Sequence, residues 1–193
     1  MRHGIDDLLT LMQVLRDREQ GCPWDLQQDW DSIVPHTLEE TYEVADAIER
    51  RAFDELPGEL GDLLFQVVYY AQFGAEEQRF DFADIVDTLT TKMLRRHPHV
   101  FPDGTLASRR PPGVSAEEVQ TQQVNSRWES LKAEERAERA VERPSVLDDV
   151  PRTLPALSRA AKLSKRAARV GFDWPDARGV VAKIREELAG VEE

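Results

Sequence analysis

Two acidic pairs, placed symmetrically about one point of the chain, constrain its fold more than any other feature. Glu40 and Glu43 lie three residues apart, and so do Glu59 and Asp62. The two pairs are placed symmetrically about residue 51, where the chain should turn. Because residues three apart on a helix share a face, an antiparallel helical hairpin would turn the two pairs toward each other. Glu40 would then lie opposite Asp62, and Glu43 opposite Glu59.

Four carboxylates in one patch need either protons or a cation between them. Bare, they repel one another, and some would have to take up a proton. Oxygen ligands without histidine or cysteine suit Mg²⁺, or Mn²⁺. A structural alternative stays open, because glutamates are common on helices of an acidic protein and Thr37 with Glu40 also fits a capping box.

The rest of the chain predicts an all-α fold, because apolar residues recur at helical spacing along almost its whole length. The first predicted helix has an apolar face from Ile5 to Leu15 and stops before the turn residues at Gly21. The others cover about 35–51 with Pro35 or Thr37 at the start, 54–77 with Asp54 as N-cap and Pro57 in the first turn, 82–96 with Asp81 as N-cap, 115–141 after a capping box, about 155–170, and 177–193. No strand is predicted. Trp24 and Trp30 are expected to be core or loop anchors.

One predicted helix is apolar on nearly every side over residues 63–71. Such a helix must be covered all round, and a chain of 193 residues has few elements with which to do this. We therefore predict a helical bundle that is completed by a second copy of the chain.

Charge and composition exclude several classes of protein. The chain has 25 Lys and Arg against 37 Asp and Glu, which argues against a protein that binds a nucleic-acid backbone. No apolar run is long enough for a membrane span, and the N-terminus has no signal pattern. The single cysteine, Cys22, fits a reducing compartment. We expect a cytoplasmic protein that binds neither nucleic acid nor membrane.

A basic face on the 82–96 helix adds to the acidic patch. Lys92, Arg95 and Arg96 lie three or four residues apart and share that face. They either complement the helix dipole or hold phosphate oxygens beside a metal, the arrangement used in phosphoryl transfer. Trp128 and Lys132 are one turn apart, and Trp128 could stack on a base or pack.

Two other enzyme classes are disfavoured. The chain has no GxxxxGK[ST] loop, which excludes a P-loop enzyme. None of the four histidines has an acid three residues before it, which disfavours a di-iron bundle.

Glu39-Glu40-x-x-Glu43 followed by Glu59-x-x-Asp62 resembles the EExxE…ExxD signature of the MazG family of nucleoside triphosphate pyrophosphohydrolases. Four longer sequence segments strengthen the resemblance: Gly21-Cys22-Pro23-Trp24-Asp25, His36-Thr37-Leu38-Glu39-Glu40-Thr41-Tyr42-Glu43, Gly58-Glu59-Leu60-Gly61-Asp62-Leu63-Leu64-Phe65-Gln66 and Arg95-Arg96-His97-Pro98-His99-Val100-Phe101. The resemblance implies an all-α, magnesium-dependent dimer that converts (d)NTPs to monophosphate and pyrophosphate and so removes unwanted nucleotides.

The resemblance also implies a role for each site residue. Glu40, Glu43, Glu59 and Asp62 would be metal ligands, and Glu39 would support the ligands or orient water; our own hypothesis is that Glu39 is the catalytic base. Lys92, Arg95 and Arg96 would hold the polyphosphate, while Trp128 and Lys132 would border the nucleotide.

We expect residues 1–141 to form this module, 142–155 a linker, and 156–193 a helical tail. The tail resembles the start of a second, incomplete module: Glu186 and Glu187 follow an aromatic turn as Glu39 and Glu40 do, but Gly190 replaces the third acid and no ExxD pair follows. The alternative function is a catalytically silent helical module for dimerisation or regulation, with a vestigial acidic site.

Overall fold

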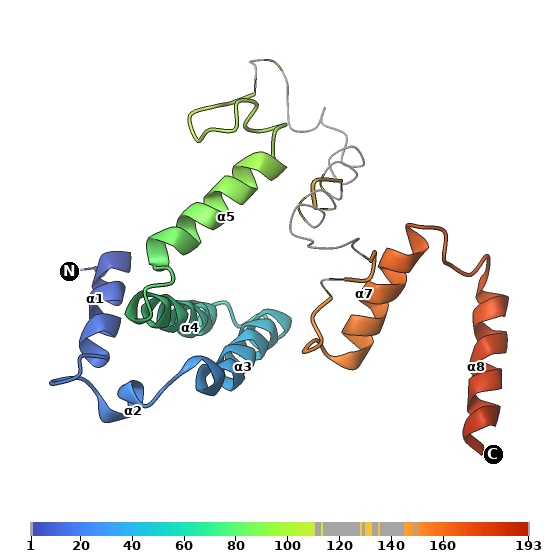
Figure 1. Ribbon diagram of the computed structural model, residues 1–193, viewed down its shortest axis with the longest axis horizontal. Coiled ribbons are helices and arrows are strands. Elements are labelled where there is room, and N and C mark those ends of the chain that lie inside the picture. Colours follow the sequence, from blue (N-terminus) through green and yellow to red (C-terminus); the bar gives the residue numbers. More distant parts are fainter. Residues whose placement is uncertain are drawn as a thin grey trace. The chain divides into compact units, whose positions relative to one another are not determined.

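The computed structural model describes residues 2–110, 113, 128, 130–132, 135, 145–148 and 150–192. Every regular element in this part of the chain is an α-helix, as the sequence predicts. The chain divides into two compact units, residues 1–111 and 112–193. The first holds α1 (Ile5–Leu15), α2 (Pro23–Leu26), α3 (Trp30–Glu49), α4 (Leu56–Glu76) and α5 (Phe82–Arg96), and the second holds α7 (Ala156–Ala168) and α8 (Ala177–Glu192) (Figure 1). None of the described helices is both long and apolar enough to cross a membrane.

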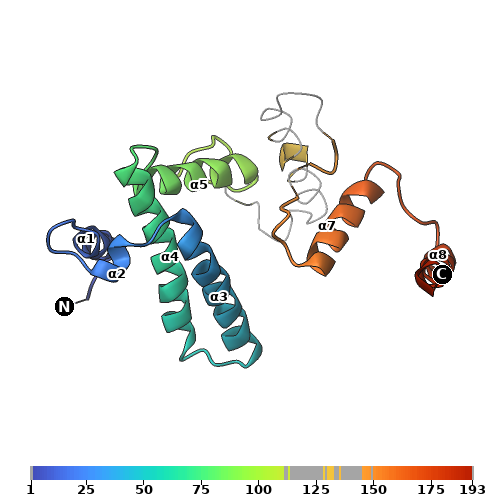
Figure 2. The same cartoon turned by 60° about the horizontal axis from the view of Figure 1, so that its bottom comes forward.

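Helices α3 and α4 form an antiparallel hairpin, which Figure 2 shows side by side along its length. The chain reverses at Arg51, the centre of the two acidic pairs, where the backbone takes a left-handed φ of 61°. The N–H of Ala52 donates to the carbonyl of Ala47 at 2.9 Å and closes the end of α3. Arg50 then binds Asp46 at 2.6 Å and Glu55 at 2.7 Å, so the same side chain joins both arms of the turn.

The core of the first unit lies at the open end of the hairpin. Helices α1, α3 and α4 contribute its buried side chains, which are Met12, Ile33, Val68, Tyr69 and Phe73. Phe82, the first residue of α5, packs against this cluster and fixes the start of that helix. The half of the hairpin that carries the turn therefore projects from the core.

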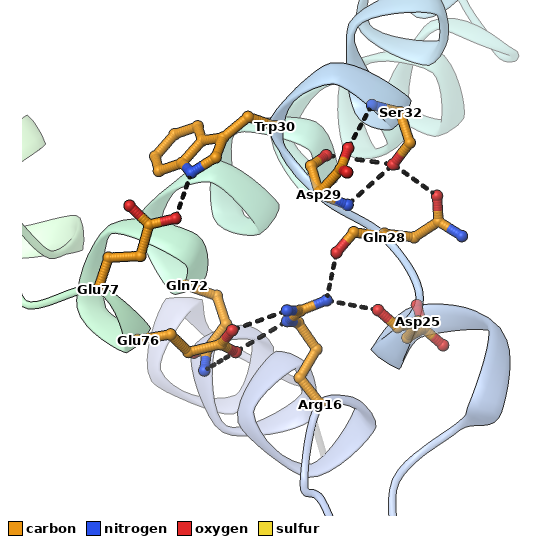
Figure 3. A network of polar contacts seen from close by, with 9 residues as sticks. All are labelled: Arg16, Asp25, Gln28, Asp29, Trp30, Ser32, Gln72, Glu76 and Glu77. Carbon is orange, nitrogen blue, oxygen red and sulfur yellow. Dashed lines mark hydrogen bonds and ion pairs between the residues drawn. The ribbon is translucent and has the colours of Figure 1, made fainter.

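A polar network around Arg16 ties α1, α2 and α4 together (Figure 3). The Arg16 side chain is only 9% exposed and donates two hydrogen bonds to Glu76, at 2.8 and 2.7 Å. It also donates to the backbone carbonyls of Asp25 and Gln28 and lies over the Phe73 ring at 4.5 Å. These contacts hold the short helix α2 against the core.

Helix α3 begins at Trp30, five residues before the predicted start at Pro35. Asp29 and Ser32 form a reciprocal capping box, with bonds of 2.8 and 2.9 Å (Figure 3). The Trp30 ring stacks on Tyr70 with centroids 5.9 Å apart. The prediction was wrong because the cap and the packed tryptophan together outweigh the hydrogen bond that a proline inside the helix cannot donate.

The earlier start removes the capping-box alternative for Glu40. Thr37 lies in the middle of α3, where its hydroxyl donates to the carbonyl of Ile33 at 3.1 Å. Thr37 and Glu40 therefore do not form a capping box, and Glu40 has no role at the helix terminus.

The other boundaries lie close to the prediction. Helix α1 ends at Leu15, before Gly21 as expected, α5 has the predicted bounds, and Asp81 caps α5 by accepting from the N–H of Asp84 at 3.0 Å. Helix α4 begins two residues late, so Asp54 is not its cap, while Pro57 does lie in its first turn. The capping box predicted at 115–118 lies outside the described residues.

Candidate metal centre

Three carboxylates converge on the projecting half of the hairpin. Glu40 and Glu43 from α3 and Glu59 from α4 each offer one oxygen, and these oxygens lie within 4.8 Å of one another. Glu40 and Glu59 are half-buried, and Glu43 is exposed. The turn at residue 51 produces this convergence, because it sets the two helices antiparallel in the register that faces the two pairs toward each other.

Asp62 and Glu39 lie around this group rather than within it. The charges of both side chains act on Glu40, and both are exposed. The Oε2 atom of Glu39 is 3.8 Å from Nδ1 of His36, one turn earlier on α3. Three of the five acids that the sequence singles out thus have oxygens within 4.8 Å of one another, and the other two are near enough for their charges to act on Glu40.

The electrostatics of the group favour a cation. Burial raises the pKa of Glu40 above its ordinary value, and a hydrogen bond with Glu43 together with the charges of Glu43, Asp62 and Glu39 raises it further. A divalent cation would relieve this repulsion, and carboxylate oxygens are the ligands that hard cations prefer. The donor set therefore fits such an ion.

The basic face lies at the far end of α5 from the core. Lys92 and Arg96 are half-buried and Arg95 is exposed. Helix α5 packs against α4 near the core, at the end of α4 opposite Glu59. Because a helix rises 1.5 Å per residue, Lys92 lies about 15 Å beyond Phe82 along α5. The packing of α5 within one chain therefore does not by itself bring this face onto the carboxylates.

Trp128 and Lys132 belong to the second unit, where the Lys132 ammonium lies 5.3 Å from the centroid of the Trp128 ring. This contact is a cation–π pair across one helical turn. Their part in nucleotide binding stays a prediction.

Sequence reasoning missed two features beside the carboxylates. Trp30 is a core anchor as expected, but Trp24 is 52% exposed, with its ring 6.2 Å from that of His36. Gln66 is buried on α4, and its Oε1 atom has no hydrogen-bond partner among the described residues. A polar residue four positions after Asp62 in an apolar run was the available signal for Gln66.

Comparisons with known proteins agree with this geometry. A family model described as the MazG nucleotide pyrophosphohydrolase domain matches residues 28–101, which hold α3, α4 and α5. A nucleoside triphosphate pyrophosphohydrolase of Escherichia coli (strain K12) is 56% identical over 184 residues, which are 95% of this chain and 65% of that protein.

Two further relatives are more distant. The nucleoside triphosphate pyrophosphohydrolase/pyrophosphatase MazG of Thermotoga maritima is 38% identical over 97% of this chain and 66% of its own length. A nucleoside triphosphate pyrophosphohydrolase of Mycobacterium tuberculosis is 35% identical over 86% of this chain and 45% of its own length. The chain thus spans just under two thirds of the Escherichia coli and Thermotoga proteins.

The domain match, the identities to these relatives and the acids that the matched helices bring together all support one conclusion. The chain belongs to the MazG nucleotide pyrophosphohydrolase family.

Proposed function

We propose that this protein is a Mg²⁺-dependent hydrolase that converts (deoxy)nucleoside triphosphates to monophosphates and pyrophosphate, and that it clears unwanted nucleotides in the cytoplasm. The observation that carries the proposal is the convergence of Glu40, Glu43 and Glu59 within 4.8 Å on two facing helices. The substrate class comes from the relatives, which are named nucleoside triphosphate pyrophosphohydrolases.

The acids divide into ligands and a base. Glu40, Glu43, Glu59 and Asp62 would hold the cation, which would be Mg²⁺ or Mn²⁺. When bound, the cation would supply Lewis acidity and positive charge for the phosphate oxygens. Glu39 borders the ligands and is exposed, so it can take a proton from the attacking water.

The basic face would complete the reaction. Lys92, Arg95 and Arg96 would bind the triphosphate oxygens and neutralise the charge of the departing pyrophosphate. The bond that breaks is the anhydride between the α- and β-phosphates, and the oxygen of water is added to one side of it. Trp128 and Lys132 would border the nucleotide.

We also propose that the protein is a homodimer. Leu38 and Tyr42 on α3 and Leu60 and Leu64 on α4 are between 39% and 61% exposed on the hairpin, so the apolar helix is not covered all round within one chain. Apolar side chains that gather into an exposed patch mark interaction sites. A second hairpin would cover it and build a four-helix bundle, in which basic residues of either copy could approach the carboxylates.

A pyrophosphate-release assay tests the proposal directly. Glu43→Ala and Asp62→Ala should abolish turnover of a panel of ribo- and deoxynucleoside triphosphates in Mg²⁺, because each removes a carboxylate from the cation site. Asp46→Ala is the matched control, since Asp46 lies one turn from Glu43 but binds Arg50 instead. Full pyrophosphate release by Glu43→Ala would reject the site, and a wild-type protein inactive on every nucleotide would favour the silent dimerisation or regulatory module.

A further inference from the structure

Gln66 is a polar side chain in the most apolar stretch of α4. It is only 6% exposed, and its side-chain carbonyl oxygen, Oε1, accepts no hydrogen bond from the described residues. Buried polar atoms in native proteins nearly always have a partner, and a group left without one points to an ion, a water or a ligand that supplies it. Oε1 can only accept, so the missing partner must be a donor.

The neighbours of Gln66 show which way it faces. Asp62, Gln66 and Tyr70 are spaced four residues apart and form one stripe of α4. The Tyr70 hydroxyl lies 2.9 Å from the Thr37 hydroxyl on α3. At the other end of the stripe, the charge of Asp62 acts on Glu40, which is also on α3. Gln66 therefore lies between two points at which α4 faces α3, one helical turn from Asp62 and two from Glu59.

Gln66 is on the core side of the carboxylates, where other groups suited to a nucleoside are found. His36 is one turn before Glu40 on α3, and the half-exposed ring of Trp24 lies against it. The opposite side, toward the turn of the hairpin, is taken by the ion pairs of Arg50 with Asp46 and Glu55. A nucleotide with its phosphates on the carboxylates would accordingly extend its nucleoside toward Gln66.

We propose that Gln66 is a specificity-determining residue that binds the sugar of the substrate, with Oε1 accepting a hydrogen bond from a sugar hydroxyl. This inference rests on the proposed function, because it takes the phosphates to lie on the carboxylates. A hydroxyl supplies the donor that the buried oxygen lacks, whereas ionised phosphate oxygens only accept. Gln66 lies four residues, about 6 Å along the helix, from Asp62, which is short enough to join an α-phosphate held at that ligand to a contact with the attached sugar.

The test compares four triphosphates of one base, which carry ribose, 2′-deoxyribose, 3′-deoxyribose and 2′,3′-dideoxyribose. The wild-type kcat/KM should fall at least about tenfold when the contacted hydroxyl is missing, because the buried oxygen is then left without a donor. The 2′-deoxy and 3′-deoxy substrates identify which hydroxyl is contacted. In Gln66→Met, which keeps the side-chain length but removes the acceptor, the difference should shrink to about twofold or less.

Gln72→Met is the matched control, because Gln72 lies on the same helix but binds Glu76 near the core. It should keep the wild-type sugar preference. Equal use of all four sugars by the wild type would overturn the inference, and so would an unchanged preference in a folded Gln66→Met. If Gln66→Met does not fold, the wild-type comparison still decides, and Gln66→Asn, which withdraws the oxygen by one methylene, should weaken the preference.

A protein without activity would be tested by binding instead. Calorimetry with non-hydrolysable α,β-methylene triphosphates of the four sugars should then show the same preference in the wild type and its loss in Gln66→Met. Binding with the sugar preference but without turnover would contradict the proposed hydrolysis and keep the role of Gln66. Turnover without any sugar preference would support the proposed hydrolysis and overturn the role of Gln66. A protein with neither turnover nor a sugar preference in binding would overturn both proposals.

Discussion

The side chain of Glu40 carries the largest electrostatic conflict of the site. Burial and the neighbouring acids raise its pKa above the ordinary value of 4.5. A raised pKa in the folded state means that the folded protein binds this proton more tightly than the unfolded chain does. Stability from this group is therefore complete below about pH 4.5 and is lost as the pH rises through the folded-state pKa.

The raised pKa of Glu40 predicts how pH and divalent cations together affect the stability of the fold. Without divalent ions, the melting temperature should lose the contribution of Glu40 as the pH rises above about 4.5. Saturating Mg²⁺ should oppose that loss, because the cation binds the ionised carboxylate and has no proton to displace at higher pH. Melting curves of wild type and Glu40→Gln from pH 4 to 8 measure this. The same Mg²⁺ effect in Glu40→Gln would contradict it.

At the scale of single residues, the sequence predicted the carboxylates but missed Gln66. The acids could be found because helical spacing and a single turn fix their mutual placement. The orphaned oxygen of Gln66 could not be found, since a sequence shows that a residue is polar but not which of its atoms are left without a partner. Trp24 was missed for a similar reason: its exposure depends on how the Arg16 network seats α2.

At the scale of helices, the start of α3 shows where local rules conflict. Proline at the sixth position argues for a later start, and the capping box at Asp29 for an earlier one. The structure follows the cap, because the extra turn also places Trp30 and Ile33 in the core. The sequence carried both signals, and only the packing of these two side chains decides between them.

Two substitutions should separate the effect of the Asp29 cap on α3 from that of Pro35. Asp29→Ala should lower the free energy of unfolding by about 1 kcal/mol, because it removes the cap of α3. Pro35→Ala should not lower it, since alanine restores a backbone donor and Pro35 is exposed. Urea unfolding of both variants gives the comparison. A loss of stability in Pro35→Ala larger than that in Asp29→Ala would show that the proline, not the cap, sets this end of the helix.

At the scale of the whole molecule, the all-α class and most helix boundaries of the described part follow from periodicity and caps. The predicted division into 1–141, 142–155 and 156–193 stays a prediction, because much of 114–144 lies outside the described residues. The second copy of the chain was inferred from one helix that is apolar all round. The structure adds that four apolar side chains, those of Leu38, Tyr42, Leu60 and Leu64, are exposed on the two helices that also carry the acids.

The homodimer predicts a specific loss of assembly. Light scattering of the wild type at micromolar concentration should give twice the mass of one chain. Leu38→Glu and Leu60→Glu should shift it to the monomer, because each puts a charge into the hairpin surface. Leu11→Glu on α1, at a site similarly exposed but away from the hairpin, should remain a dimer. A monomeric wild type would refute the proposed interface.

The central claim is that two facing helices hold one divalent cation that in turn binds the triphosphate. A crystal structure with Mg²⁺ and a non-hydrolysable triphosphate tests it most directly. We expect a metal ion bound by oxygens of Glu40, Glu43 and Glu59 and also by a phosphate oxygen of the ligand. A triphosphate bound elsewhere, or a metal ion that leaves these three carboxylates unligated, would contradict the account.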